Sequence, residues 1–340
     1  MIKLGIIGWR GIVGNVFINR IKYSNLYKNC KLFLFSTNKF LNKNIYFAFN
    51  IKILFNMNII VCCQGSDYTK KILTLLIIKK WKGYWIDASS CLRMKNYNEL
   101  ILDPLNKKKL LFSLKKNKIY SGSNCTVSLC LLSLINLFKL NLIEWIISSS
   151  YQAISGAGYF LIKKIINEIN YLKNKNYNFL KFEKDNKINF KNIPILLNAI
   201  PWIDKKVSFG QTKEEWKSQS EASKILNKKV YIDSNCVRIS SLRCHSQFFL
   251  IKLKKEISLN EFYNIINNNY IKIIKNNDFF TKKFLNPFYI CGKLKIFLGR
   301  IRKNSINKKI FNLFSIGDQL LWGAAEPIKR FLEIIFDYLI

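Results

Sequence analysis

Short apolar runs alternate with helical patterns through the first third of the chain. The runs at residues 2–7, 30–35, 59–63 and 85–87 have strand length, and patterns with helical spacing follow the first and the third of them. Strands that alternate with helices indicate a parallel sheet covered by helices, with ligands bound at the carboxyl ends of the strands. We therefore predict an α/β domain over residues 1–123.

The remainder of the chain has a different pattern. A long, mainly apolar run over residues 127–138 predicts one buried helix. Residues 145–150 predict a strand, and two later runs, at residues 231–240 and 248–253, alternate like the strands of a mixed or antiparallel sheet. We predict an α+β second domain over residues 124–326, with an amphipathic helix over residues 327–340 after it.

The turn after the first apolar run carries Gly8, Gly11 and Gly14, spaced as GxxGxxG. Between a strand and a helix, the first glycine permits a tight turn, the second lets the backbone approach a pyrophosphate, and the third lets helix and strand pack closely. A purely structural turn is the alternative for so short a motif. Its place at the opening of an α/β pattern favours dinucleotide binding.

The end of the second apolar run indicates which dinucleotide binds. An NAD site usually places an acidic residue there for the ribose 2′-hydroxyl. This chain has Ser36, Thr37 and Lys39 instead, with Arg10 in the glycine turn. Hydroxyl and cationic groups suit a 2′-phosphate, so we predict NADP(H).

Cys125 is the candidate nucleophile. It lies in Ser121-Gly-Ser-Asn-Cys-Thr-Val-Ser128, a polar turn that leads into the long apolar run. A thiol at a helix N-terminus is stabilised as thiolate, although most free cysteines are buried and unreactive. The chain's one histidine, His245, is structural or is the acid/base partner of that thiol. The hypothesis is that the two side chains meet in the fold, with His245 in the segment that connects two strands.

Further polar residues stand where strands or helices end. Gln64 and Arg93 follow the third and fourth apolar runs, and Arg93 is either a surface cation or an anion ligand. Glu214 and Lys217 share a helix face, where an exposed ion pair would contribute little to stability. The planar fork of Arg238 can hold a carboxylate through two hydrogen bonds.

Composition narrows the class of protein. The formal net charge is +36, but the basic residues are spread along the chain, whereas a nucleic-acid binder concentrates them on one face or motif. We expect a solvated basic surface and no nucleic-acid partner; a non-catalytic basic binding paralogue is an alternative function.

The cysteines and the membrane pattern indicate the compartment. The chain has nine cysteines, none of them in a CxxC pair, and one histidine, which indicates a reducing compartment and no zinc site or other metal. The opening segment resembles a strand and not a leader, and no uncharged apolar run has membrane-spanning length. We therefore expect a cytoplasmic protein without a membrane partner.

Several blocks make the chain similar to aspartate-semialdehyde dehydrogenases of the Gram-negative bacterial type, in order from residue 2 to about residue 333. They are Gly8-Trp-Arg-Gly-Ile-Val-Gly14, Cys63-Gln-Gly-Ser-Asp-Tyr-Thr69, Ser121 to Ser128, Tyr151-Gln-Ala-Ile-Ser-Gly156, Glu214-Glu-Trp-Lys217, Val237-Arg-Ile, Arg243-Cys-His-Ser246 and Gly317-Asp-Gln-Leu-Leu-Trp-Gly-Ala-Ala-Glu-Pro327.

The resemblance implies a Rossmann-type NADP-binding domain, on which the helix over residues 327–340 packs back, and a catalytic and dimerisation domain of the glyceraldehyde-phosphate-dehydrogenase-like kind. It implies a homodimer that reduces L-aspartyl-4-phosphate with NADPH to aspartate semialdehyde and phosphate, through a thioester on Cys125. This reaction lies on the routes to lysine (through diaminopimelate), threonine and methionine. The nearest alternative is a related acyl-phosphate reductase, of the N-acetylglutamyl-phosphate reductase type. Its acetylated substrate has no ammonium for Glu214.

The resemblance also assigns a role to each site residue. Cys125 and His245 are catalytic, and the backbone N–H groups around Asn124 and Cys125 are expected to hold the oxyanion. Gln152, Glu214 and Arg238 bind the substrate, and Arg93 and Lys217 bind phosphate. The cofactor site comprises Gly8, Arg10, Gly11, Ile12, Val13, Gly14, Ser36, Thr37, Gln64, Ser155, Gly156 and Gln319.

Overall fold

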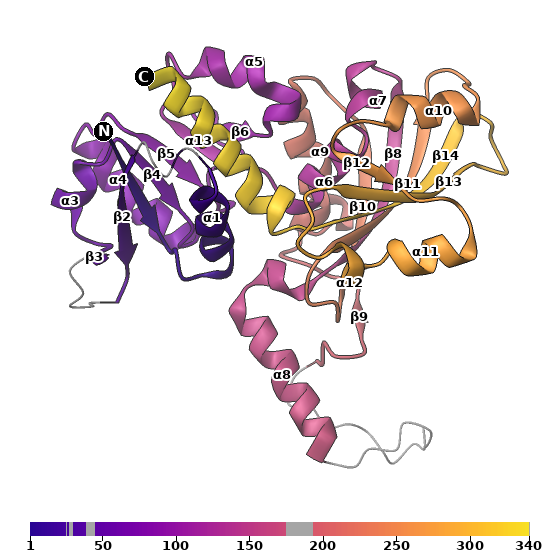
Figure 1. Ribbon diagram of the computed structural model, residues 1–340, viewed down its shortest axis with the longest axis horizontal. Helices are drawn as coiled ribbons and strands as arrows, with labels where there is room; N and C mark the ends of the chain where they lie inside the picture. Colours follow the sequence, from indigo (N-terminus) through magenta and orange to yellow (C-terminus); the bar gives the residue numbers. More distant parts are fainter. Residues whose placement is uncertain (25, 27–29, 39–44, 175–192, 340) are drawn as a thin grey trace.

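The computed structural model describes residues 1–24, 26, 30–38, 45–174 and 193–339, and two seven-stranded sheets organise it (Figure 1). Lys39, predicted above to face the cofactor, lies outside the described residues. The first sheet contains β1 (Ile2–Ile7), β2 (Cys30–Ser36), β3 (Ile45–Phe47), β4 (Ile59–Cys62), β5 (Tyr84–Asp87), β6 (Glu99–Ile101) and β7 (Ile119–Gly122). The second contains β8 (Ile143–Gln152), β9 (Ala199–Ile200), β10 (Ile232–Ile239), β11 (His245–Leu253), β12 (Ile271–Ile273), β13 (Ile296–Lys303) and β14 (Ile310–Gly317).

Helices pack against both sheets. Those of the first part of the chain are α1 (Ile12–Lys22), α3 (Ile51–Phe55), α4 (Ser66–Ile78) and α5 (Asp103–Ser113). Later helices are α6 (Cys125–Ser133), α7 (Ile135–Lys139), α8 (Tyr159–Asn174), α9 (Lys213–Leu226), α10 (Leu259–Ile266), α11 (Asp278–Phe284), α12 (Pro287–Ile290) and α13 (Glu326–Leu339). Short helical turns are η1 (Ile154–Ala157), η2 (Ser208–Gly210) and η3 (Leu321–Ala325), the last of them π-helical. Helix α8 extends away from both sheets (Figure 1).

The first sheet is parallel, with strand order β3-β2-β1-β4-β5-β7-β6. Successive side chains of a strand point to opposite faces, so Leu4 and Ile6 pack with α1 and α13, while Ile7 packs with α4. Both faces are therefore buried, as a parallel sheet requires. The strand order reverses between β1 and β4, and such a switch point opens a crevice at the carboxyl ends of the strands.

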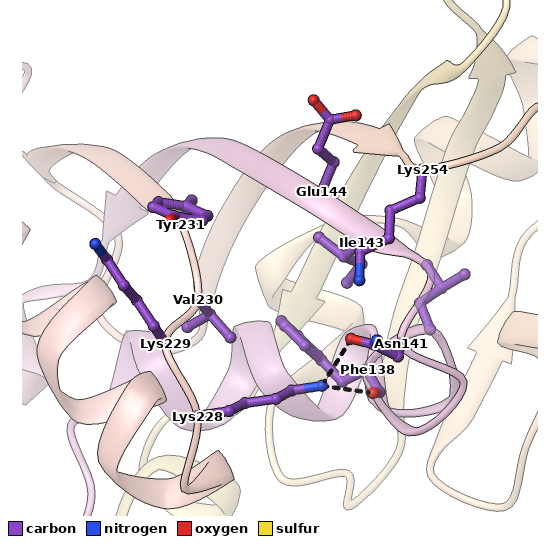
Figure 2. Close-up of a pocket in the computed structure, with 10 residues that line it drawn as sticks. Phe138, Asn141, Ile143, Glu144, Lys228, Lys229, Val230, Tyr231 and Lys254 are labelled. Atoms are coloured by element: carbon purple, nitrogen blue, oxygen red, sulfur yellow. Dashed lines mark hydrogen bonds between the residues drawn. The ribbon is translucent and has the colours of Figure 1, made fainter.

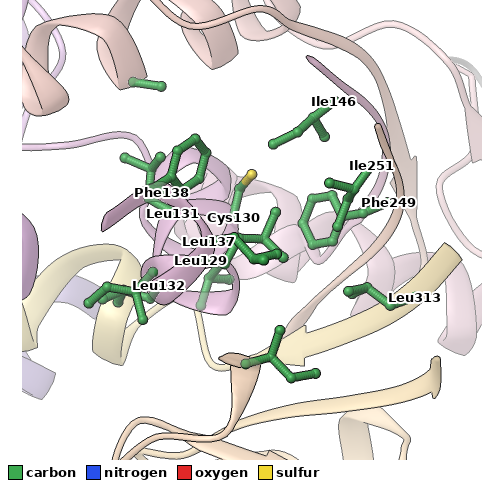
Figure 3. Packing of buried hydrophobic residues seen from close by; sticks show 14 of the residues in the cluster. Leu129, Cys130, Leu131, Leu132, Leu137, Phe138, Ile146, Phe249, Ile251 and Leu313 are labelled. Carbon is green, nitrogen blue, oxygen red and sulfur yellow. The ribbon is translucent and has the colours of Figure 1, made fainter. Parts of the chain in front are cut away.

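The second sheet is mixed, with strand order β12-β13-β14-β11-β8-β10-β9. Strands β8 and β10 run parallel, whereas β11 is antiparallel to both of its neighbours. Helix α6 covers one face: Leu129 and Leu132 belong to the same buried cluster as Phe249 and Leu313 of the strands (Figure 3). This core fixes the helix that begins with Cys125 against the strand that begins with His245.

Helix α13 contacts the first domain, where we expected it to pack. The ring centroids of Phe331 and Tyr120 are 4.5 Å apart. Arg330 donates two hydrogen bonds of 2.8 and 2.6 Å to Oδ2 of Asp103. Contacts of both kinds fix the end of the described chain against α5 and β7.

The structure corrects two local predictions. The apolar run predicted as one helix forms two, α6 and α7, because Leu134 leaves helical geometry (φ −117°, ψ 18°). His245 is the first residue of β11 and not part of the connecting segment, because its backbone pairs with Gly317 of β14. Neither change moves these residues out of the buried interior.

Candidate active site

A cavity of about 460 Å³ opens beside the carboxyl ends of the first sheet. Its first-domain lining includes Val13 at the start of α1, Ala88 after β5 and Arg93. The second domain contributes Cys125 and His245, together with the polar side chains described below. The cavity therefore joins the predicted nucleotide crevice to the predicted nucleophile.

Cys125 begins helix α6, as its sequence context predicted. The side chain of Asn124 caps the helix, accepting hydrogen bonds from the backbone N–H groups of Thr126 and Val127 at 2.9 and 3.3 Å. Gly323 of η3 lies directly against the nucleophile: a Cβ atom at this glycine would be 2.5 Å from Cβ of Cys125. The thiol is thus held between a capped helix end and a backbone that tolerates no side chain.

His245 lies beside this thiol, with Nε2 3.2 Å from Sγ of Cys125. The backbone N–H of Ala153 donates to Nδ1 at 3.0 Å. Because Nδ1 accepts this bond, the proton of the neutral ring is assigned to Nε2. The imidazole therefore presents an N–H donor to the sulfur.

The protonation states of the pair follow from their burial. Burial and the Glu214 carboxylate raise the pKa of the Cys125 thiol to about 12, although three cations lining the cavity act in the opposite direction. Burial, assisted by Arg238, lowers the pKa of His245 to about 3. The resting pair is a thiol beside a neutral imidazole, whereas the helix N-terminus alone led us to expect a thiolate.

Glu214 and Lys217 form a buried ion pair and not the exposed pair that their spacing left open as an alternative. Nζ of Lys217 lies 2.8 Å from Oε2 of Glu214 and 2.9 Å from Oδ2 of Asp204. The other carboxylate oxygen, Oε1 of Glu214, accepts hydrogen bonds from the amides of Asn124 and Gln152 at 3.0 and 3.3 Å. Burial opposes the charge of Glu214, but Lys217 outweighs it and holds the pKa of the carboxyl below its usual value. Both side chains line the cavity in their charged forms.

Two arginines complete the cationic part of the lining. Arg93 is buried, and its NH1 group lies 3.3 Å from Oε1 of Glu221. Among the described residues, Nε of Arg93 has no hydrogen-bond partner. NH1 of Arg238 donates to the backbone oxygen of Ala153 at 2.6 Å. Both arginines line the cavity near Cys125, and two guanidinium groups on one cavity suit an anionic ligand.

The backbone of Asn124 departs from expectation. Its N–H, expected to hold the oxyanion, donates instead to Oε2 of Glu221 at 2.6 Å. The first turn of α6 still begins at Cys125, whose N–H is the first of the helix. That leaves the N–H of Cys125 as the backbone candidate for the oxyanion.

A second hollow, of about 310 Å³, lies over the glycine turn and the end of β2. Gly8 has a left-handed φ of 75°, and a Cβ atom on it would lie 2.7 Å from the backbone of Cys63. On Gly14, a Cβ atom would lie 2.2 Å from the oxygen of Gly8. These two glycines are therefore needed for the close turn and for the packing of α1 on it. Gly11 has more room, and its N–H donates to the oxygen of Gly8 at 3.1 Å.

The same hollow gathers the residues predicted to meet a 2′-phosphate. Its lining includes Arg10, Ser36, Thr37 and Gln64. NH2 of Arg10 lies 2.5 Å from Oγ of Ser36. The chemistry of this set and the shape of the glycine turn fit a phosphorylated dinucleotide.

The remaining predicted residues lie between the two parts of the site. Gln319 lines the cavity, and its amide donates to Oγ of Ser155 at 2.6 Å while its oxygen accepts from the N–H of Cys244 at 2.7 Å. A Cβ atom at Gly156 would lie 3.4 Å from Cε1 of His245. Ile12 begins α1 next to Val13. Gln319 thus fixes the strand end that carries His245.

Sequence reasoning missed three of the groups that build this site. They are Asp204, which pairs with Lys217; the side chain of Asn124, which bonds to Glu214; and Glu221. Glu214, Lys217 and Glu221 follow one another at spacings of three and four on one face of α9, and all three are buried. That spacing was the sequence signal that could have placed Glu221 on the same helix face as Glu214 and Lys217.

A smaller hollow elsewhere has a different character. It measures about 100 Å³ and lies between α7 and the start of β10, where Nζ of Lys228 donates to Oδ1 of Asn141 at 3.1 Å and to the oxygen of Phe138 at 3.4 Å (Figure 2). It shares no lining residue with the cavity of Cys125. The chemistry concentrates in the larger cavity.

Comparisons with known proteins agree with this geometry. Residues 3–112 match the family model described as "Semialdehyde dehydrogenase, NAD binding domain", and residues 134–322 match "Semialdehyde dehydrogenase, dimerisation domain". A solved aspartate semialdehyde dehydrogenase from Francisella tularensis is 38% identical, with a TM-score of 0.88 over 98% of this chain and 100% of that one.

More distant structures share the fold. Aspartate semialdehyde dehydrogenase II from Vibrio cholerae, complexed with ASA, is 21% identical, with a TM-score of 0.83 over 99% of this chain and 98% of that one. The enzyme from Candida albicans, with NADP, is 14% identical, with a TM-score of 0.71 over the whole of both chains. Since both domain models match in order and the similarity to the F. tularensis enzyme spans nearly the full length, the chain belongs to the semialdehyde dehydrogenase family.

Proposed function

We propose that this protein is an aspartate-semialdehyde dehydrogenase, which reduces L-aspartyl-4-phosphate to L-aspartate 4-semialdehyde and phosphate with NADPH. The observation that carries the proposal is the 3.2 Å contact between Sγ of Cys125 and Nε2 of His245. This pair lies on a cavity whose lining also holds the charged groups of Glu214, Lys217, Arg93 and Arg238. The 38% identity to the F. tularensis enzyme supports the same substrate.

The charged groups match the substrate group by group. L-aspartyl-4-phosphate carries a phosphate, a carboxylate and an ammonium. Arg93 and Lys217 would bind the phosphate, the fork of Arg238 would hold the carboxylate, and Glu214 would bind the ammonium. Gln152, whose amide bonds to Glu214 at 3.3 Å, would place the reacting carbonyl over Cys125.

Cys125 provides covalent catalysis in this scheme. Its sulfur attacks the acyl carbon, the bond to the phosphate oxygen breaks, and the thiol proton ends on the departing hydrogen phosphate, leaving a thioester. When bound, NADPH supplies the hydride that reduces this thioester. Nε2–H of His245 donates a hydrogen bond to the sulfur anion as it forms and as it leaves, since Nδ1 is occupied by the N–H of Ala153.

The nucleotide end of the site supports NADP over NAD. Strand β2 ends at Ser36 and is followed by Thr37, with Arg10 within 2.5 Å of the serine hydroxyl. Neither residue at this strand end is acidic, so a 2′-phosphate meets hydroxyls and a guanidinium. Gly8, Gly11 and Gly14 would hold the pyrophosphate at the start of α1. The cavity wall at Gly156, with Ser155 next to it and bonded to Gln319, would meet the nicotinamide.

We also propose a homodimer. The second domain matches a dimerisation-domain model. Its sheet exposes Ile147 of β8, and Tyr231 just before β10 is also exposed, so a second copy could cover both. No described helix has both the length and the apolar character needed to cross a membrane.

We propose a cytoplasmic location. The cysteines of the described chain are free thiols, as is typical of proteins in a reducing compartment.

One assay tests the substrate. Phosphate-dependent reduction of NADP is measured with aspartate semialdehyde, N-acetylglutamate semialdehyde and glyceraldehyde 3-phosphate. We expect aspartate semialdehyde to be turned over with by far the largest kcat/KM. Equal or better activity with either rival aldehyde would reject the assignment, and no activity with any of them would favour a non-catalytic paralogue.

A further inference from the structure

Glu221 is a buried carboxylate that the scheme above leaves without a role. It lies on α9, four residues after Lys217, and is 1% exposed. Its Oε2 accepts the backbone N–H of Asn124 at 2.6 Å, and its Oε1 lies 3.3 Å from NH1 of Arg93. One side chain thus contacts the residue that precedes the nucleophile and a cation of the predicted phosphate site.

Glu221 contacts a residue that lines the cavity but does not line the cavity itself. It lines a neighbouring hollow of about 230 Å³ and is not among the residues that line the cavity of Cys125. Arg93 and Lys217 border both spaces. A substrate in the cavity would therefore meet Arg93 but not the carboxylate that holds it.

Both contacts are strong because they involve charge in a buried site. The bond to Asn124 fixes the N-cap of α6, and hence the start of the helix that carries Cys125. The contact with Arg93 occupies NH1 and leaves Nε, which has no hydrogen-bond partner among the described residues. The carboxylate thus sets the distance and orientation between the helix that carries Cys125 and the guanidinium of Arg93, a residue that lines the cavity.

We propose that Glu221 is a positioning residue, which ties Arg93 to the N-terminus of the nucleophile helix so that the phosphate is held in line with Cys125. This inference rests on the proposed function. It differs from a purely structural role, because it requires that loss of the carboxylate weaken phosphate binding specifically.

The test compares Glu221→Gln with wild type. The amide oxygen of glutamine can still accept from Asn124, but its NH2 group meets the NH1 donor of Arg93, so only the contact with Arg93 is lost. We expect the KM for phosphate to rise about tenfold, with a smaller change in the KM for aspartate semialdehyde. Glu221→Ala, which removes both contacts, should in addition lower kcat.

The matched control is Glu168→Gln. Glu168 is also a buried carboxylate that accepts backbone N–H groups, from Ile195 and Leu196, but it does not line the cavity. We expect this variant to lose stability without a change in the KM for phosphate. In an Arg93→Ala background, Glu221→Gln should add nothing to the KM for phosphate, because its target is already gone.

A second readout needs no turnover. Phosphate is titrated against alkylation of Cys125 by iodoacetamide, followed by mass spectrometry of the peptide that contains Cys125. The concentration that halves the rate should rise about tenfold in Glu221→Gln. Unchanged protection and an unchanged KM for phosphate in this variant would overturn the proposal. The two proposals can fail separately. If phosphate protects Cys125 of the wild type but the protein does not oxidise aspartate semialdehyde, the proposed function is wrong. The comparison of protection in wild type and Glu221→Gln then still decides the role of Glu221.

Discussion

The two ends of the cleft are built in different ways. At the nucleotide end, the backbone sets the shape: Gly8 and Gly14 make room that any Cβ atom would fill, and the glycine turn itself is one short stretch of the chain. At the thiol end, charged side chains set the shape, and they come from distant segments: Asn124 and Glu214 are 90 residues apart and Arg93 and Glu221 are 128 apart. A backbone site fails by steric overlap, whereas a charged site fails when a buried group loses its partner.

We expect the largest effect on activity when a charge is removed at the thiol end. In Glu214→Gln, Lys217 loses one of its two carboxylate partners and the substrate ammonium loses its ligand. We expect a loss of about 3 kcal/mol in transition-state stabilisation, or roughly a hundredfold in kcat/KM for aspartate semialdehyde. Glu215→Gln is the control on the same helix, because Glu215 caps α9 and bonds to Cys236 outside the cavity. If both variants lose activity equally, the charged lining has no special role.

A smaller effect is expected where charge enters the nucleotide end. Ser36→Asp places a carboxylate beside the expected 2′-phosphate and within reach of Arg10. The ratio of kcat/KM for NADP to that for NAD should fall roughly thirtyfold, equivalent to about 2 kcal/mol. Ser36→Ala, which removes the hydroxyl without adding charge, should change this ratio far less. If the ratio stays constant in Ser36→Asp, the 2′-phosphate of NADP does not bind next to Ser36.

The pH dependence probes the thiol end directly. The pKa of Cys125 is raised to about 12 and that of His245 is lowered to about 3, so between pH 6 and 9 only the thiolate fraction changes. Alkylation of Cys125 by iodoacetamide should therefore accelerate about tenfold per pH unit over this range. The profile should have no inflection near pH 6.5, since His245 stays neutral. A rate that is flat above pH 7 would show that the resting group is a thiolate.

The smallest effect should come from a single methyl group at the nucleotide end. In Gly14→Ala, the new Cβ atom would lie 2.2 Å from the oxygen of Gly8, so the turn must shift. We expect the KM for NADP to rise about fivefold, or roughly 1 kcal/mol, with kcat little changed. Gly292→Ala is the control for replacing a glycine: Gly292 is left-handed (φ 80°), unlike Gly14, but it has open space around it and lies far from the glycine turn in sequence. Equal KM values in the two variants would contradict a role for the close packing at Gly14.

The contrast between local backbone geometry and long-range side-chain contacts also explains which features could be predicted from the sequence. The glycine turn and the strands around it were predictable because local spacing specifies them: β1 begins and ends at the residues expected, Ile2 and Ile7, and α4 follows the third apolar run. The break at Leu134 was not, since the apolar run through it has no local signal and both halves lie in one core.

The partners of the charged residues were the main omission. The spacing of Glu214 and Lys217 is also typical of surface pairs, so it left an exposed pair as an alternative to a ligand role. Only the fold reveals that Asp204 and Asn124 contact them. Likewise, a helix N-terminus favours a thiolate, but burial has the opposite and larger effect on Cys125. Long-range contacts decide both cases.

The central claim is that Cys125, alone among the nine cysteines, forms the thioester. The most direct measurement mixes the protein with aspartate semialdehyde and NADP in the absence of phosphate, and follows both NADPH and the mass of the Cys125 peptide. The account predicts a burst of one NADPH per site, an aspartyl group on Cys125, and neither of these in Cys125→Ser. A burst that persists in Cys125→Ser, or an acyl group on another cysteine, would contradict it.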